Sequence, residues 1–153
     1  MNKFMEMAVE EARKGMNSNE GGPFGAVVVR DGKVIARAHN RVLKTNDPTA
    51  HAEILAIRQA ASELEDFDLS GCEIYATSQP CPMCYSAIHW ARIEKLHYGT
   101  TKDDVATIGF DDSFIYEIIK GESEPQVEED NTDRDSCLEL LDEWEKKPDK
   151  VMY

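Results

Sequence analysis

The chain has 153 residues, a length that fits one domain with a hydrophobic core of its own. Its 30 acidic and 17 basic side chains give a formal net charge of −13, which disfavours a nucleic-acid partner because phosphate binding draws on clustered lysine and arginine. No apolar run is long enough for a bilayer and no signal-peptide pattern is present. We therefore expect a single cytoplasmic domain, residues 1–153, without a membrane segment.

Hydrophobic periodicity and turn residues predict the elements in chain order. A helix over 2–17 precedes two strands, 24–29 and 34–39, which Asp31-Gly32 joins in a tight hairpin. The later predicted elements are a helix from 49 to about 65, a strand over 73–77, a helix over 82–92, a strand over 95–100, and helices over 111–119 and 134–145. This order predicts an α/β fold, a three-layer α/β/α sandwich with a central mixed sheet.

No catalytic or ligand-binding role is predicted for the acidic stretch after Gly121. Residues 121–133 form an acidic, solvated connection, and 134–153 form a C-terminal helix and tail. Trp90 and Trp144 lie at helical positions, where packing is the default role. Nothing points to secretion, so the cysteines should be reduced, with Cys72 and Cys137 as small buried hydrophobic residues.

The segment TAHAEILAIRQA, residues 49–60, has the pattern of a helix. One interpretation is purely structural: Thr49 caps the helix and Glu53 favours its positive end. The other is chemical, because the start of a helix after a loop often lines a cleft. In that case His51 can hold a metal and Glu53 can carry a proton, but the segment alone does not decide.

A second segment, SQPCPMC over 78–84, places Cys81 and Cys84 one helical turn apart after a strand. Alone, such a pair also fits a redox site or half of a structural zinc site. With His51 the two cysteines form a three-ligand set for catalytic zinc, which leaves the fourth position to water. Zinc lowers the pKa of that water toward about 7, and the non-ligating Glu53 can move its proton to a leaving group.

The order H-x-E followed by P-C-x-x-C is the signature of zinc nucleobase and nucleoside deaminases. With GGPFGAVVV, NDPTAHAE, PCPMC and GFDDSFIY, it makes residues 4–120 resemble the bacterial guanine deaminases of the cytidine/deoxycytidylate deaminase superfamily. The resemblance implies a cytidine deaminase-like fold, Zn²⁺ held by His51, Cys81 and Cys84, and Glu53 as proton shuttle. It also implies hydrolysis of guanine to xanthine and ammonia in purine metabolism, a small-molecule purine substrate and a homodimer.

Two further residues follow from this resemblance. In similar deaminases an asparagine at the place of Asn40 hydrogen-bonds the base, although an asparagine that only ends a strand is the alternative. The segment GFDDSFIY, residues 109–116, distinguishes guanine deaminases from tRNA-editing relatives. Guanine has donors at N1 and N2 that Asp112 can accept, whereas adenine has an acceptor at N1. Asp111 and Asp112 could instead only cap the following helix.

One position departs from the family pattern, and other functions stay open. Gln79 stands where these deaminases commonly have glutamate, which removes a negative charge near the metal and puts the rate and exact substrate in question. The alternatives are adenosine-to-inosine deamination in tRNA, which the charge and GFDDSFIY weaken, another amino-purine or amino-triazine substrate, and a binding module with structural zinc. Glu53 argues against the last, because a structural site normally closes with a fourth protein ligand.

The chain ends in KKPDKVMY, where Pro148 stops the last helix and an apolar Val151-Met152-Tyr153 follows. A frayed terminus is the ordinary interpretation. In guanine deaminases the C-terminal segment resembles a lid that reaches over an active site, sometimes that of the partner subunit. By that resemblance, Tyr153 helps to close the purine pocket and to exclude water from it.

Overall fold

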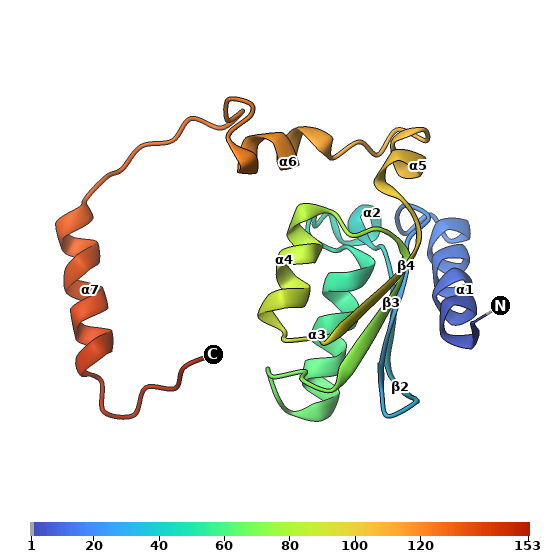
Figure 1. Ribbon diagram of the computed structural model, residues 1–153, viewed down its shortest axis with the longest axis horizontal. Helices are drawn as coiled ribbons and strands as arrows, with labels where there is room; N and C mark the ends of the chain where they lie inside the picture. Colours follow the sequence, from blue (N-terminus) through green and yellow to red (C-terminus); the bar gives the residue numbers. More distant parts are fainter. Residues whose placement is uncertain (1) are drawn as a thin grey trace.

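The computed structural model describes residues 2–153 (Figure 1). Its elements in chain order are α1 (Lys3–Asn17), β1 (Gly25–Arg30), β2 (Lys33–His39), α2 (Val42–Thr45), α3 (Ala52–Leu64), β3 (Cys72–Ser78), α4 (Pro82–Trp90), β4 (Lys95–Thr100), α5 (Lys102–Ala106), α6 (Ser113–Lys120) and α7 (Arg134–Lys146). Among these described helices, none combines the length and the apolar character that crossing a membrane requires.

The four strands form one mixed sheet in the order β2-β1-β3-β4. Strand β1 is antiparallel to both β2 and β3, whereas β3 and β4 are parallel. The predicted hairpin is confirmed: Asp31 and Gly32 both have positive φ, 50° and 73°, as a two-residue turn of this kind requires. The sheet is therefore built outward from β1, which has a partner on each side.

Helices cover both faces of the sheet, which confirms the predicted three-layer arrangement (Figure 1). Side chains of β1 alternate between two core clusters: Ala26 and Val28 lie in the cluster under α3, and Val27 and Val29 lie in the cluster under α1. The α3 residues in the core are three fully buried alanines four residues apart, Ala52, Ala56 and Ala60. Their short side chains allow α3 to approach the sheet closely, which fixes the start of this helix against the strands.

The start of α3 differs from the prediction. Thr49 does not cap it, because its backbone N–H and its hydroxyl both donate to Asp47 Oδ1, at 2.8 and 2.7 Å. The helix begins at Ala52, and His51 occupies the N-cap position without a side-chain cap hydrogen bond. This shift leaves the imidazole of His51 free for another role.

The prediction that the two tryptophans and Cys137 are packed inside the domain is wrong for the single chain. Trp90 is 69% exposed and Trp144 is 40% exposed, and Cys137 is also exposed. For Trp144 and Cys137 the reason is visible in Figure 1: both lie on α7, which stands apart from the sheet and its helices at the end of a long connection. Cys72, in contrast, is fully buried at the start of β3, as predicted.

Candidate active site

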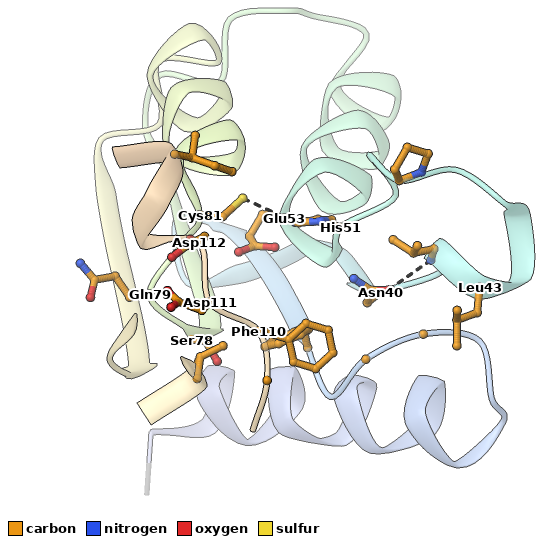
Figure 2. A pocket seen from close by; sticks show the side chains of 18 of the residues that line it. Asn40, Leu43, His51, Glu53, Ser78, Gln79, Cys81, Phe110, Asp111 and Asp112 are labelled. Atoms are coloured by element: carbon orange, nitrogen blue, oxygen red, sulfur yellow. Dashed lines mark hydrogen bonds between the residues drawn. The ribbon is translucent and has the colours of Figure 1, made fainter. Parts of the chain in front are cut away.

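Two helices begin at the same end of the sheet and bring the predicted metal ligands together (Figure 2). His51 is the N-cap of α3, and Cys81 is the N-cap of α4, which begins with Pro82 after β3 has ended. Neither residue is assigned a side-chain cap hydrogen bond of the kind that Ser, Thr, Asp or Asn makes at a helix start. Unpaired N–H groups at a helix start favour negative charge, so this position favours a thiolate at Cys81.

The distances between the three side chains fit a single zinc ion. His51 Nδ1 lies 3.5 Å from Cys81 Sγ and 3.5 Å from Cys84 Sγ, and all three ligand atoms lie within 4.8 Å of one another. Tetrahedral zinc, with Zn–S near ~2.3 Å and Zn–N near ~2.0 Å, separates sulfur from nitrogen ligands by about 3.5 Å. The structure therefore forms a candidate zinc site with three protein ligands.

The hydrogen bonds among these three side chains also fit a metal site. Hydrogen bonds from Cys84 and from His51 lower the pKa of the Cys81 thiol, and the hydrogen bond to Cys81 raises the pKa of His51. The Cys81 thiolate thus accepts hydrogen bonds from both of its neighbours, Cys84 and His51. Because a zinc ion can replace such shared protons, the same three atoms form a compact donor set for the metal.

Glu53 lies on the first turn of α3, two residues after His51, and its carboxylate points into the same space (Figure 2). It is 9% exposed, and burial raises its pKa. A carboxylate with a raised pKa is a better proton acceptor at neutral pH than an exposed one. Glu53 is therefore placed and tuned to take up a proton next to the metal ligands.

These residues open onto a cavity of about 650 Å³. Its walls come from the loop after α1, the end of β2, the start of α3 and the segment from Gly109 to Ile115. Phe24 and Phe110 form an edge-to-face pair in the wall, with ring centroids 5.1 Å apart. In the described part of the chain, no lysine or arginine lines this cavity, whereas Glu53, Asp111 and Asp112 do. Such a cavity suits an uncharged aromatic ring better than a phosphate group.

Asn40 is buried in the wall directly after β2. Its backbone N–H donates to Phe24 O at 3.0 Å, and its Oδ1 accepts from the Val42 N–H at 3.1 Å (Figure 2). The amide oxygen is thus held by the backbone, which leaves the NH₂ group as the donor toward the cavity. Asn40 ends a strand, as the structural interpretation proposed, and it also lines the cavity.

The two neighbouring aspartates have different environments. Asp111 Oδ1 accepts from the backbone N–H of Ser113 at 2.9 Å and from its hydroxyl at 2.6 Å, and these bonds lower the pKa of Asp111. Asp112, the N-cap of α6, makes no side-chain cap hydrogen bond, and burial raises its pKa. Asp111 therefore stabilises the turn before α6, and the Asp112 carboxylate is left facing the cavity.

Comparison with known proteins agrees with this geometry. Residues 1–100 match the family model of the cytidine and deoxycytidylate deaminase zinc-binding region. The chain belongs to this family. The guanine deaminase of Bacillus subtilis is 49% identical over 124 residues, covering 81% of this chain and 80% of that protein. Its X-ray structure superposes with a TM-score of 0.89 at 42% identity, covering 100% of this chain and 99% of that one. A tRNA-specific adenosine deaminase of Agrobacterium fabrum is 51% identical over 96 residues, covering 63% of this chain and 62% of that protein.

Gln79 of this deaminase has a role that its sequence did not indicate. Its side chain points away from the metal ligands (Figure 2), and its Oε1 accepts from the Lys102 N–H at 3.2 Å. The same loop is fixed by Tyr116, whose hydroxyl donates to Pro80 O at 2.9 Å. These two contacts tie α5 and α6 to the loop that holds Cys81. The amide of Gln79 accepts this hydrogen bond without a negative charge.

Tyr153 does not reach the cavity of its own chain. Its ring lies 6.4 Å from that of Phe67, centroid to centroid, beyond the far end of α3 from His51. The 13 residues of α3 span about 20 Å. A role for this tyrosine over a purine pocket therefore requires a second copy of the chain.

We expect one zinc ion per chain after purification without chelators, because the fold already brings the three ligand atoms together. The double variant Cys81→Ala/Cys84→Ala should lose the ion, since one imidazole cannot hold it alone. Elemental analysis measures both. Cys137→Ala, which removes the exposed thiol on α7, is the matched control and should keep one zinc ion. A zinc content that is unchanged in the double variant would contradict the site.

Proposed function

We propose that this deaminase hydrolyses guanine to xanthine and ammonia. The observation that most supports it is the Asp112 carboxylate, which lines the cavity beside the candidate zinc site without a side-chain cap hydrogen bond, in a segment beyond the residues that match the family model. Similarity to guanine deaminase extends over 81% of the chain, against 63% for the tRNA deaminase. A cytoplasmic enzyme of purine metabolism would fit this substrate.

Asn40 and Asp112 would bind complementary edges of the purine. In Figure 2 they lie on opposite sides of Glu53. The amide NH₂ of Asn40 can donate to purine acceptor atoms, and the carboxylate of Asp112 can accept from N1–H and the 2-amino group of guanine. Adenine has an acceptor at N1, so its lone pair would face the carboxylate. This pairing favours guanine and orients the amino-bearing carbon toward the metal ligands.

Glu53 would serve as the proton carrier of the reaction. Zinc held by His51, Cys81 and Cys84 would supply Lewis-acid activation of a water for attack on C2. Glu53 would take one proton from that water and deliver it to the ring nitrogen, and would then pass the remaining proton of the added hydroxyl to the departing amine. The sum is guanine plus water giving xanthine plus ammonia. Burial of Glu53 supports this role, because it keeps bulk water from competing for the proton.

The alternative functions have less support. A tRNA substrate needs cations for its phosphates, yet no lysine or arginine lines the described cavity and the net charge is −13. A structural-zinc module would leave the buried, non-ligating Glu53 without a purpose. Another amino-purine or an amino-triazine with a donor next to its amino group would make the same contacts with Asp112. Measured rates of ammonia release distinguish such substrates from guanine.

A homodimer would supply the partner that α7 lacks. An isolated helix of 13 residues is marginal in water, and most helical stability comes from packing an apolar face. The apolar side chains of α7 are exposed in the single chain: Leu138, Leu140, Leu141 and Trp144. Tyr85 and Trp90 are also exposed on α4, Tyr85 in its first turn after Cys81 and Trp90 at its last residue. A second copy of the chain that covers the exposed faces of α4 and α7 would bury these side chains together.

Glu53→Gln should keep the fold and the zinc ion while kcat falls by about 10²–10⁴-fold, because the amide has the shape of the acid but cannot carry a proton. Steady-state ammonia release measures the loss. Glu63→Gln, the same change at an exposed position of α3, should leave kcat unchanged. A Glu53→Gln enzyme within a few-fold of the wild type would show that another group moves the proton.

Ammonia release from guanine, adenine, cytosine, guanosine, ammeline and a tRNA anticodon stem tests the substrate. The wild type should prefer guanine. Asp112→Asn should reduce kcat/KM for guanine more than for substrates without an N1 donor. Asp111→Asn should leave the order of substrates unchanged, because the Asp111 carboxylate is already hydrogen-bonded to Ser113 in the turn before α6. Equal losses on all substrates in Asp112→Asn would make this residue structural.

Removal of residues 148–153 should leave zinc content and folding intact but raise KM or lower kcat for guanine, if Tyr153 closes the pocket of a second copy. Mixing this truncated chain with the Glu53→Gln chain provides a sharper measurement. In a mixed dimer the intact tail of one chain meets the intact site of the other, so activity should rise above that of either parent. Unchanged kinetics after truncation would show that the tail plays no part in the reaction.

A further inference from the structure

A cluster of charged side chains lies behind the cavity wall, outside the site described above. His39, which is 9% exposed, places Nδ1 3.1 Å from Glu11 Oε2 and Nε2 3.0 Å from Glu20 Oε2. Glu20 Oε1 also accepts from Lys44 Nζ at 2.8 Å, and Arg41 Nε lies 3.2 Å from Glu20 Oε2. The Lys44 hydrogen bond, followed by that from His39, lowers the pKa of Glu20 to about 2. Glu20 is thus an ionised carboxylate with three cationic or hydrogen-bonding neighbours.

The members of this cluster alternate in sequence with residues of the cavity wall. Glu20 precedes Gly21 and Gly22, and both glycines line the cavity. His39 precedes Asn40, and Lys44 follows Leu43; Asn40 and Leu43 are wall residues as well. The backbone repeats the connection, because the Lys44 N–H donates to Glu20 O at 3.0 Å. One carboxylate therefore joins the loop after α1, the end of β2 and the short helix α2.

The wall is packed too closely for the loop to move independently of Asn40. A Cβ atom on Gly21 would lie 2.1 Å from Asn40 Oδ1 and 2.5 Å from Asn40 O, so the backbone of this loop is in direct contact with the amide. The same Oδ1 accepts from the Val42 N–H. A displacement of the loop or of α2 would change the direction in which the Asn40 NH₂ group points.

We propose that Glu20 is a positioning residue for substrate binding: its carboxylate fastens the Gly21–Gly22 loop and α2 to the end of β2 and thereby fixes the amide of Asn40. The kinetic consequence of this inference rests on the proposed function. Asn40 would bind the base and move no proton, so loss of its orientation should raise KM more than it lowers kcat. Glu20 itself touches no reacting atom, because it acts from behind the wall.

Amide hydrogen exchange tests the positioning without any substrate. In Glu20→Gln, the Val42 amide should exchange about tenfold faster, the scale of one charge-assisted hydrogen bond, while amides of the central strand β3 stay unchanged as the internal reference. Lys44→Met, at a half-exposed position, should give a smaller rise in the same direction. Glu122→Gln is the matched control, because Glu122 also pairs with a cation, Lys120, but neither residue contacts the cluster. Unchanged exchange at Val42 in Glu20→Gln would overturn the proposal.

Kinetics of a double-mutant cycle provide the second readout. With Asn40 intact, Glu20→Gln should raise KM for guanine by about tenfold. In an Asn40→Ala background the same change should raise KM by less than about twofold, since the amide that Glu20 positions is then absent. An equal rise in both backgrounds would show that Glu20 acts elsewhere. If the wild type releases no ammonia from guanine, the proposed function fails, and the exchange at Val42 still decides the role of Glu20.

Discussion

The convergence of two helix N-termini at one end of the sheet is the constraint on which the rest of the site depends. Helices α3 and α4 both begin there because β1 pairs with β2 on one side and with β3 on the other, so the loops that follow β2 and β3 open at the same edge. Each helix presents a ligand at its N-cap instead of a capping side chain. The local stability lost by leaving two helix starts uncapped, about 1 kcal/mol each, is the kind of loss that a metal bound at the same positions can offset.

Short-range signals made much of this predictable from the sequence. The Asp31-Gly32 hairpin depends on adjacent residues, the sheet with helices on both faces on the order of strand and helix patterns, and the set of His51, Cys81 and Cys84 on two short motifs. The sequence could not show that Thr49 is already bonded to Asp47. An Asx turn and a helix cap use the same residue types, and only the three-dimensional contacts separate them.

Tertiary contacts account for the other differences. Asp111 and Asp112 are equivalent as sequence signals for a cap, yet one is bonded to Ser113 and the other faces the cavity. The charged cluster around Glu20 gave no sequence signal, because its members come from four separate segments. The exposed tryptophans show the limit of helical periodicity, which marks an apolar face but does not say whether the residues that cover it belong to the same chain.

The acidic composition affects the site in a specific way. Burial removes two of the many carboxylates, Glu53 and Asp112, from the water that stabilises the others as anions, and this raises their pKa. The cavity holds these two groups without a lysine or arginine in its described lining. Their negative charge is then balanced either by a metal ion or by hydrogen-bond donors on the ligand. A neutral base with adjacent N–H groups supplies such donors. A phosphorylated ligand would instead add negative charge to a wall whose described lining already holds carboxylates and no lysine or arginine, so the lining disfavours a phosphate group.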